Sequence, residues 1–335
     1  MKFLLLADVH AQNMGFSRAS KERMLYVKQL FEDLKELSIL HKPNAIILAG
    51  DLWTPKYDIN RLLFKELYDI LENFNNFIAK FNIKLFLLLG NHEYPCAFLL
   101  NMFKQSHIMP ILKQKKIAGP DFDLFLQPYN KHIAEDISNI VLSKDKNYLI
   151  SHCPVLEGRP SMDTKIFTDL SIKDLQHEKF DYVILGDFHT HQKIDSNVYY
   201  LGSPFPLDFG ATNLLPCVFM LDTETNEFIK HKLPSVYPKF RQVKIEKIFK
   251  ELLDYNPKDY YRIFCPFEMV QQYKLLYPDA EIVPLHNKDE LNTKVATLKQ
   301  ISFSDRIKDY VDLTTTELDK NILIGMGNRL VKESI

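Results

Sequence analysis

The chain has 335 residues, 46% hydrophobic and 25% charged, with a formal net charge of −1, and these values are typical of a soluble globular protein. It has no run of eighteen apolar residues, and its four cysteines are scattered without a CxxC pair, which excludes a membrane-spanning helix, a disulfide scaffold and a zinc knuckle. The net charge requires that any contact with a phosphate backbone come from local patches or bound metal.

Short, almost wholly apolar runs recur along the chain. Runs that are apolar on both faces are typical of parallel strands covered on both sides by other layers. The run that begins at Phe3 breaks at Asp8 and offers no small-residue cleavage site, so it predicts a first strand and not a signal peptide. The runs are Phe3–Ala7, Ala45–Leu48, Leu85–Leu89, Tyr148–Ile150 and Tyr182–Leu185.

Amphipathic helical segments lie between the first strands. Ser20–Leu40 carries an apolar stripe through Leu30, Leu34 and Leu37, with charged residues on the other side, and Asn60–Phe81 repeats the pattern. Alternating strands and helices predict an α/β domain with right-handed crossovers. No G-x-G-x-x-G or G-K-[ST] loop occurs, which argues against a dinucleotide enzyme or an ATPase.

The character of the sequence changes after about residue 240. Tyr260–Phe264, a helix near Phe267–Leu276 and Glu281–Pro284 predict a small β-α-β unit, preceded by a lysine-rich stretch. A polar, linker-like stretch follows. A helical pair, Phe303–Tyr310 and Thr316–Val331, is predicted to close the chain.

Polar side chains follow each of the five predicted strands at the point where the strand ends. Because sites in open α/β sheets form beyond the carboxyl ends of the strands, we expect these groups to meet at one sheet edge. Carboxylate, amide and imidazole donors without a thiolate suit Mn²⁺, Fe²⁺ or Zn²⁺. Each motif alone is more often turn chemistry, but the ordered set indicates a metal site. The segments are Asp8-Val9-His10, Gly50-Asp51, Gly90-Asn91-His92-Glu93, Ser151-His152 and Gly186-Asp187-Phe188-His189-Thr190-His191.

This donor set is typical of phosphate-ester hydrolysis. Two cations roughly 3.5–4 Å apart lower the pKa of a shared water and clamp both ends of an in-line displacement. We assign Asp51 as the carboxylate that bridges them. His92 is the candidate for an imidazole that is not a ligand and that stabilises or protonates the leaving group.

The ordered motifs D-x-H, G-D, G-N-H-E, H and G-x-x-H resemble those of the calcineurin-like metallophosphoesterases, in particular the SbcD-type recombination nucleases and their phage relatives. LADVH before a long helix and AIILAGDLW, and DYVILGDFHTH before VYYLGSPFPLDFG, carry the narrower likeness over residues 1–225. The resemblance implies an α/β fold, an α-β-β-α sandwich over 1–238. It further implies a small α/β cap over 239–290 that positions DNA, and a linker with a partner-binding helical segment over 291–335.

The resemblance also implies two ligand sets that share Asp51, with His92 as the acid. The first set is Asp8, His10, Asp51 and His189, and the second is Asp51, Asn91, His152 and Asp187. The family's closing motif is G-H-x-H, whereas this chain has Asp187 in place of the first histidine. We expect Asp187 to ligate Mn²⁺ as an imidazole does. An alternative register puts His191 in the site instead.

An activity and partners follow from the same resemblance. It implies Mn-dependent cleavage of DNA in repair or recombination, as an exonuclease on duplex ends and an endonuclease on single strands or hairpins. It implies an SMC-like coiled-coil ATPase as partner of a nuclease homodimer within a heterotetramer. The expected location is the cytoplasm, associated with the nucleoid and without membrane contact.

Two further groups of residues have two interpretations each. One group either contacts the DNA backbone or forms a solvated charged face. It consists of Lys239, Arg241, Lys244 and Lys247. The other group either forms a seam for the partner's coiled coil or packs onto its own domain. It consists of Ile307, Tyr310, Val311, Leu318 and Ile322.

Other functions fit parts of the pattern. The G-N-H-E motif also occurs in protein serine/threonine phosphatases, but there the second motif is the arginine-bearing G-D-x-x-D-R-G, whereas Leu-Trp-Thr follows Asp51 here. A DNA-end-binding scaffold without metal is disfavoured by the intact motifs. A Cys153–His152 nucleophile is disfavoured because adjacent residues on a strand point to opposite faces.

Overall fold

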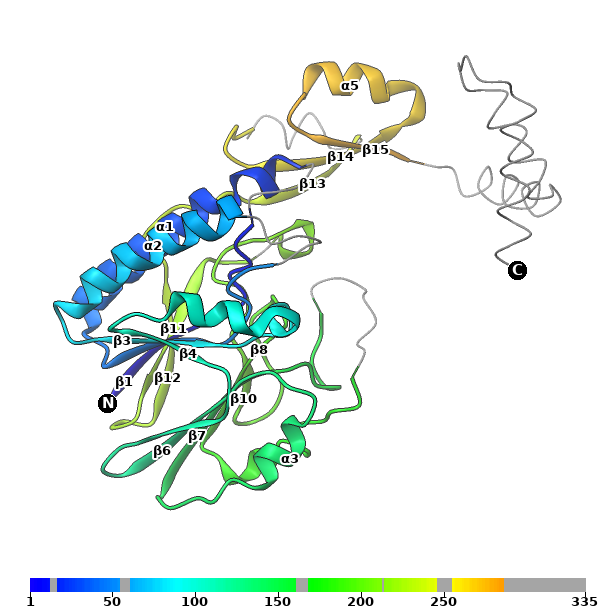
Figure 1. Cartoon of the computed structure of the whole chain (residues 1–335). Helices are drawn as coiled ribbons and strands as arrows, with labels where there is room; N and C mark the ends of the chain where they lie inside the picture. The colour runs from blue at the N-terminus through cyan, green and yellow to red at the C-terminus, as the bar shows by residue number, and fades with distance from the viewer. Residues whose placement is uncertain (13–16, 55–60, 161–167, 213, 246–254, 286–335) are drawn as a thin grey trace, which may run out of the picture. The chain divides into compact units, whose positions relative to one another are not determined.

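The structure, a computed structural model, describes residues 1–12, 17–54, 61–160, 168–212, 214–245 and 255–285 (Figure 1). The chain divides into two compact units, Met1–Ile263 with Asp279–Glu281, and Phe264–Pro278 with Ile282–Ile335. The domain boundaries predicted after residues 238 and 290 stay predictions. Among the described residues, no helix is both long and apolar enough to cross a membrane.

The first unit contains two six-stranded sheets. One sheet has the order β12-β11-β1-β2-β3-β4, in which β1 to β4 are parallel and β11 and β12 form an antiparallel edge. The bounds are β1 (Lys2–Leu6), β2 (Ala45–Leu48), β3 (Lys84–Leu88), β4 (Ile108–Ile111), β11 (Cys217–Asp222) and β12 (Glu227–Lys232).

The second sheet has the order β5-β6-β7-β8-β10-β9. Strands β6, β7, β8 and β10 are parallel, and β5 and β9 pair antiparallel at the two edges. The bounds are β5 (Lys115–Ala118), β6 (Phe122–Gln127), β7 (Lys146–His152), β8 (Tyr182–Gly186), β9 (Gln192–Lys193) and β10 (Val198–Tyr200).

Successive side chains along the central strands point to opposite faces of the sheet and pack against the layer on each side. Phe3 and Leu5 of β1 point between the sheets, where they join Ile150 of β7 in one apolar cluster. Leu4 points the other way and packs in a second cluster with Leu34 of helix α1. Each such side chain contributes roughly 1.5–3 kcal/mol by leaving water. Strands that face apolar layers on both sides therefore have to be apolar at every position, as the sequence pattern predicted.

Helices cover the outer faces of the two sheets. Helices α1 (Arg18–His41) and α2 (Arg61–Ala79) lie side by side over the first sheet, and α3 (Ile133–Ser138) lies over the second (Figure 1). Ser17 caps α1 by accepting a hydrogen bond from the Ser20 amide at 3.2 Å. The layers thus form the predicted α-β-β-α sandwich.

Several elements were not predicted from the sequence. Both edge hairpins, β5 with β6 and β11 with β12, and the 3₁₀ helices η1 (Tyr94–Phe103), η2 (His177–Lys179) and η3 (Phe209–Ala211) are additions. Strands β5 and β12 are only partly buried, so their apolar pattern is weak, whereas β6 and β11 are buried almost throughout and were missed despite their apolar residues.

The later segments agree with their predicted types. The predicted strands β14 (Tyr260–Pro266) and β15 (Glu281–Leu285) belong to a third sheet together with β13 (Phe240–Lys244), which was not predicted. The helix expected over Phe267–Leu276 is a 3₁₀ turn, η6 (Phe267–Met269), followed by α5 (Val270–Leu276). The closing helical pair, with Ile307, Tyr310, Val311, Leu318 and Ile322, lies outside the described residues.

Candidate metal centre

The strand-end segments meet in one place, as predicted, but they come from two sheets. Asp8, Asp51 and Asn91 follow β1, β2 and β3 of the first sheet, whereas His152 ends β7 and Asp187 follows β8 of the second. The expectation of a single sheet edge was therefore wrong. The two sheets pack face to face, so carboxyl ends from both can reach the same point.

Left-handed backbone marks the turns that carry these side chains. Asp8, His10, Asp51 and Asp187 have φ angles of 55°, 49°, 55° and 106°. This conformation is energetically unfavourable for residues other than glycine. Such strain persists mainly where the surrounding structure stabilises it, often at functional sites. All four of these left-handed residues are candidate ligands.

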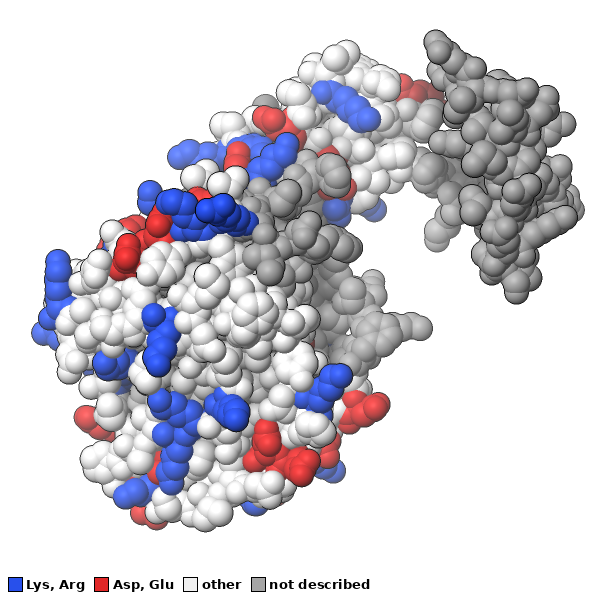
Figure 2. Space-filling view, in the orientation of Figure 1, with Lys and Arg blue, Asp and Glu red and all other residues white. Residues whose placement is uncertain are grey.

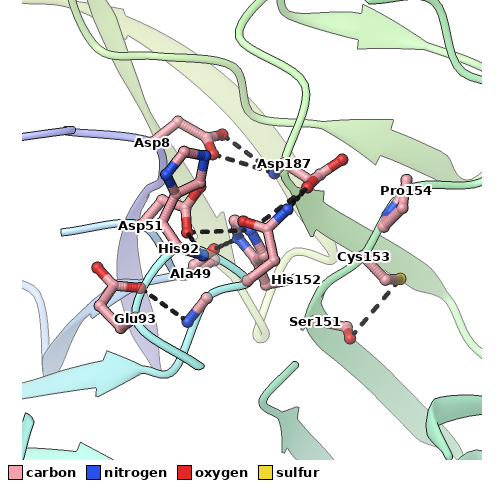
Figure 3. Close-up of polar contacts among 12 residues, drawn as sticks. Asp8, Ala49, Asp51, His92, Glu93, Ser151, His152, Cys153, Pro154 and Asp187 are labelled. Carbon is pink, nitrogen blue, oxygen red and sulfur yellow. Dashed lines mark hydrogen bonds and ion pairs between the residues drawn. The ribbon is translucent and has the colours of Figure 1, made fainter. Parts of the chain in front are cut away.

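Asp51 lies at the middle of the cluster (Figure 3). Its Oδ1 is 3.4 Å from His152 Nε2, and its Oδ2 is 3.5 Å from His10 Nε2 and 3.8 Å from His92 Nε2. The His92 amide donates to Oδ1 at 3.1 Å and so fixes the carboxylate. This position between imidazoles on both sides is the one that a bridging ligand needs.

Asp8 and Asp187 hold each other in place. The Asp187 amide donates to both carboxylate oxygens of Asp8, at 3.1 and 3.2 Å. The Asp187 carboxylate accepts from Asn91 Nδ2 at 2.6 Å and lies 3.7 Å from His152 Nε2. Asp187 therefore lies close to Asn91 and His152, two other members of the proposed second ligand set.

The donors form three groups in which ligand atoms lie within 4.8 Å of one another. They are Asp8 with His10 and His189, His10 with Asp51 and His92, and Asp8 with Asp51 and His152. The structure thus brings together every side chain assigned to the two ligand sets. The division of these ligands between two ions, and the role of His92 as a non-ligand, stay predictions.

Two imidazoles are oriented with one nitrogen facing the cluster. His152 Nδ1 lies 2.8 Å from the Ala49 carbonyl, and His10 Nδ1 lies 2.7 Å from Thr54 Oγ1. Their Nε2 atoms are buried without a hydrogen-bond partner in the described part of the chain, as is Asn91 Oδ1. A buried polar atom left unpaired is costly unless a ligand completes it, so these three atoms fit divalent cations.

The electrostatics of the cluster also fit bound cations. Burial raises the pKa of Asp8, and Asp51 and Asp187 add to this rise while His152 opposes it. Burial likewise raises the pKa of Asp187 to about 6. Burial lowers the pKa of His10 and so favours the neutral imidazole that ligates metal. Several buried carboxylates so close together repel one another, and cations between them would relieve that repulsion.

Glu93 is a buried acid to which the sequence analysis gave no role. Its carboxylate accepts from the Trp53 amide at 2.9 Å and the Gly90 amide at 3.1 Å. It therefore ties the turn after β3 to the turn after β2, which positions Asn91 and Asp51. Its position in the G-N-H-E motif could have indicated such a role. The sequence alone, however, does not show whether an acid near a strand end faces inward.

Gly50 is required for close packing against His152. Its φ is +89°, and an added Cβ would overlap the His152 ring at Nδ1. We expect Gly50→Ala to displace this imidazole and to lower Mn²⁺ affinity about 10- to 100-fold, as loss of ligand orientation does elsewhere. Isothermal titration with Mn²⁺ measures the change. Gly210→Ala, in η3, is the matched control, and equal affinity in Gly50→Ala and the parent protein would contradict the expectation.

His191, the alternative ligand, lies in other contacts. Its Nδ1 is 2.7 Å from the Tyr200 carbonyl, and its ring lies 4.5 Å from that of Phe219. We expect Asp187→Ala to lose one of two bound Mn²⁺ ions and His191→Ala to keep both. Metal analysis of the purified variants measures this. Loss of metal from His191→Ala alone would reverse the assignment.

Cys153 does not face the cluster. Figure 3 shows its side chain turned away from His152. Ser151 Oγ lies 3.9 Å from its sulfur, and burial raises the pKa of the thiol to about 12. A thiol with this pKa is protonated at neutral pH and is a poor nucleophile.

The predicted DNA-binding residues lie in several different settings. Lys239 and Lys244 are exposed, and Lys247 lies outside the described residues. Arg241 is paired with the buried Asp259, at 2.7 Å between Nε and Oδ2. Part of its role is therefore to neutralise a buried carboxylate. DNA contact by these four residues stays a prediction.

Comparison with known proteins places the first part of the chain in a family. Residues 1–193 match the model of the calcineurin-like phosphoesterases. No curated protein gives a significant sequence match.

Solved structures resemble the chain only distantly. The phosphoesterase YfcE from E. coli is 12% identical over 70% of this chain and 100% of its own, with a TM-score of 0.34. A dimetal phosphatase from Danio rerio is 10% identical over 70% and 99%, with a TM-score of 0.39. The nuclease MPE from Pseudomonas putida is 16% identical over 65% and 83%, with a TM-score of 0.32. With TM-scores this low, none of the three bears on function.

Proposed function

The chain belongs to the calcineurin-like phosphoesterase family, whose members are metal-dependent hydrolases, and we propose that it cleaves phosphodiester bonds in DNA with Mn²⁺. The proposed activity is that of an exonuclease on duplex ends and an endonuclease on single strands or hairpins. One observation supports it above all, the convergence of carboxylate, amide and imidazole donors around Asp51 at the ends of two sheets.

Each side chain has a defined part in this chemistry. Asp8, His10, Asp51 and His189 would hold one cation, and Asp51, Asn91, His152 and Asp187 the other. Bound there, two divalent cations supply Lewis acidity toward phosphoryl oxygens and lower the pKa of water. Ala49 and Thr54 fix the orientation of the two imidazoles. His92, 40% exposed and 3.8 Å from Asp51 Oδ2, would donate a proton to the leaving oxygen.

The described residues after Asp51, 52–54, bear on the choice between a diester and a monoester dianion as substrate. Leu52 and Trp53 are buried in the core, and Thr54 is bonded to His10, so residues 52–54 provide no cation for the second charge of a monoester. The positive charge of Arg23 contributes to lowering the pKa of His10, but Arg23 is itself buried and donates a hydrogen bond to the Leu207 carbonyl. A diester carries one negative charge and does not need such a cation.

Surface charge does not by itself favour a nucleic acid. On the face shown in Figure 2, Lys and Arg are interspersed with Asp and Glu and do not form one basic stripe. With a net charge of −1, attraction for the scissile phosphate has to come mainly from the cations of the centre. Cleavage is therefore expected to tolerate moderate salt better than binding by a basic groove would.

The test combines DNA and small substrates. Linear duplex DNA is incubated with Mn²⁺, and bis-p-nitrophenyl phosphate is compared with the p-nitrophenyl monoester. We expect DNA cleavage and a higher kcat/KM for the diester. A strong preference for the monoester without DNA cleavage would favour a phosphatase instead. Binding of DNA ends with no hydrolysis of any ester would favour a scaffold subunit.

We also propose that the chain forms a homodimer and that it binds an SMC-like coiled-coil ATPase. Residues 291–335 would make the contact with the ATPase. The amphipathic pattern of Ile307, Tyr310, Val311, Leu318 and Ile322 supports this docking role. Truncation after residue 295 is expected to abolish pull-down of the ATPase while hydrolysis of the diester persists. Retained pull-down would refute the docking role.

A further inference from the structure

Two tyrosine rings contact each other next to the turn after β3, which carries Asn91 and His92, and the proposed chemistry does not use them. Tyr94 follows His92 by two residues, begins η1 and is 37% exposed. Its ring centroid lies 5.3 Å from that of the half-buried Tyr129, and the two ring planes meet at 81°. In this edge-to-face contact the positive edge of one ring meets the negative face of the other, which fixes the pair as a unit.

The backbone anchors this pair at the edge of the centre. The Tyr129 amide donates to the Leu89 carbonyl at 2.8 Å, so the Tyr129 backbone lies against the residue that follows β3, two residues before Asn91. Burial and then the Asp187 carboxylate raise the pKa of the Tyr129 phenol, so this side chain is protonated at neutral pH. Both residues are therefore anchored at the turn after β3, which carries the candidate ligand Asn91 and the proposed acid His92.

The chemistry of a nucleic acid gives these rings a use. All phosphate esters contain the phosphate group, whereas only a nucleic acid also carries bases, which distinguish it from a simple phosphodiester. An unpaired base stacks on an exposed aromatic ring, and every base has a π-face, so stacking tolerates any sequence. Tyr94 offers such a ring two residues from the proposed acid.

We infer that Tyr94, held edge-to-face by Tyr129, forms a stacking platform for the nucleobase next to the scissile phosphodiester. The inference rests on the proposed nuclease function and specifies the part of the substrate that is recognised besides phosphate. A base within a closed duplex is already stacked, so the platform favours single strands and frayed ends. Loss of one base–aromatic stack corresponds to about a 5- to 150-fold change in affinity.

The test compares two polymers that differ only in their bases. Oligothymidylate and a chain of equal length built from abasic sugar units are cleaved with Mn²⁺, and kcat/KM is measured for each. Wild type is expected to prefer oligothymidylate. Tyr94→Leu and Tyr129→Leu are expected to lower that preference about 5- to 150-fold, and Tyr94→Phe to keep it because the ring remains. Tyr68→Leu removes an exposed ring on α2 as the matched control.

Each other outcome has one meaning. If wild type cleaves oligothymidylate and Tyr94→Leu keeps the preference, or lowers cleavage of both polymers equally, the platform is refuted and the nuclease function stands. If Tyr94→Leu converts a dimer to a monomer in sedimentation without changing the preference, the ring contacts a second copy instead. If wild type cleaves neither polymer, the nuclease function fails and the platform with it.

Discussion

Replacement of His92 by alanine is expected to lower kcat for phosphodiester cleavage about 10²- to 10⁴-fold, the range for loss of a general acid. The reason lies in where this imidazole stands. It is 40% exposed, while the side chains of His10 and His152 are 6% and 0% exposed. An exposed imidazole next to buried ligands can contact both a leaving oxygen and the solvent water with which it exchanges its proton.

Metal content separates this role from ligation. His92→Ala is expected to bind the same number of Mn²⁺ ions as the parent protein, with kcat measured on bis-p-nitrophenyl phosphate and on DNA. His132→Ala, which removes an exposed imidazole near α3, is the matched control and is expected to keep full activity. If His92→Ala loses an ion, His92 is a ligand beside His10 and Asp51, a grouping that the geometry also allows.

Asp51→Asn is expected to lose both metal ions and all measurable hydrolysis. This carboxylate has one oxygen 3.5 Å from His10 Nε2 and the other 3.4 Å from His152 Nε2, as the proposed bridging role requires. Although burial opposes it, the surrounding imidazoles, His152 foremost, lower the pKa of Asp51 and keep it ionised. An amide of the same shape has no negative charge to hold two cations together.

Thermal unfolding gives a second readout for this variant. Mn²⁺ at 100 times its Kd is expected to stabilise the parent protein by about 2.7 kcal/mol, because metal binds the folded state alone. The shift in Tm should vanish in Asp51→Asn and persist in Asp69→Asn, which alters an exposed aspartate on α2. A full shift in Asp51→Asn would show that this carboxylate bridges nothing.

The central strands and first helices were predictable because their patterns are local. Ala45–Leu48 was predicted with the bounds that the structure has, and α1 and α2 differ from the predicted helices by one to two residues at their ends. A strand buried on both faces leaves a continuous apolar run, and a surface helix leaves a periodic stripe. The short edge strands β5 and β9 leave neither signal.

The candidate donors were predictable for a similar reason, whereas their supports were not. Asp8, Asp51 and His152 each stand at a strand end, which the sequence shows directly. Thr54 and Ala49, which orient two imidazoles, act through one hydroxyl and one carbonyl that only the folded chain brings to them.

The sequence by itself determined which side chains are the candidate ligands, because residue type and position at a strand end can be read from the order of the chain. Only the tertiary structure decided that two sheets contribute to one centre, that Asp187 lies beside His152 while His191 turns to Tyr200, and that Glu93 joins two turns. These are relations between residues far apart in the chain, and they arise from packing, on which local sequence patterns carry no information.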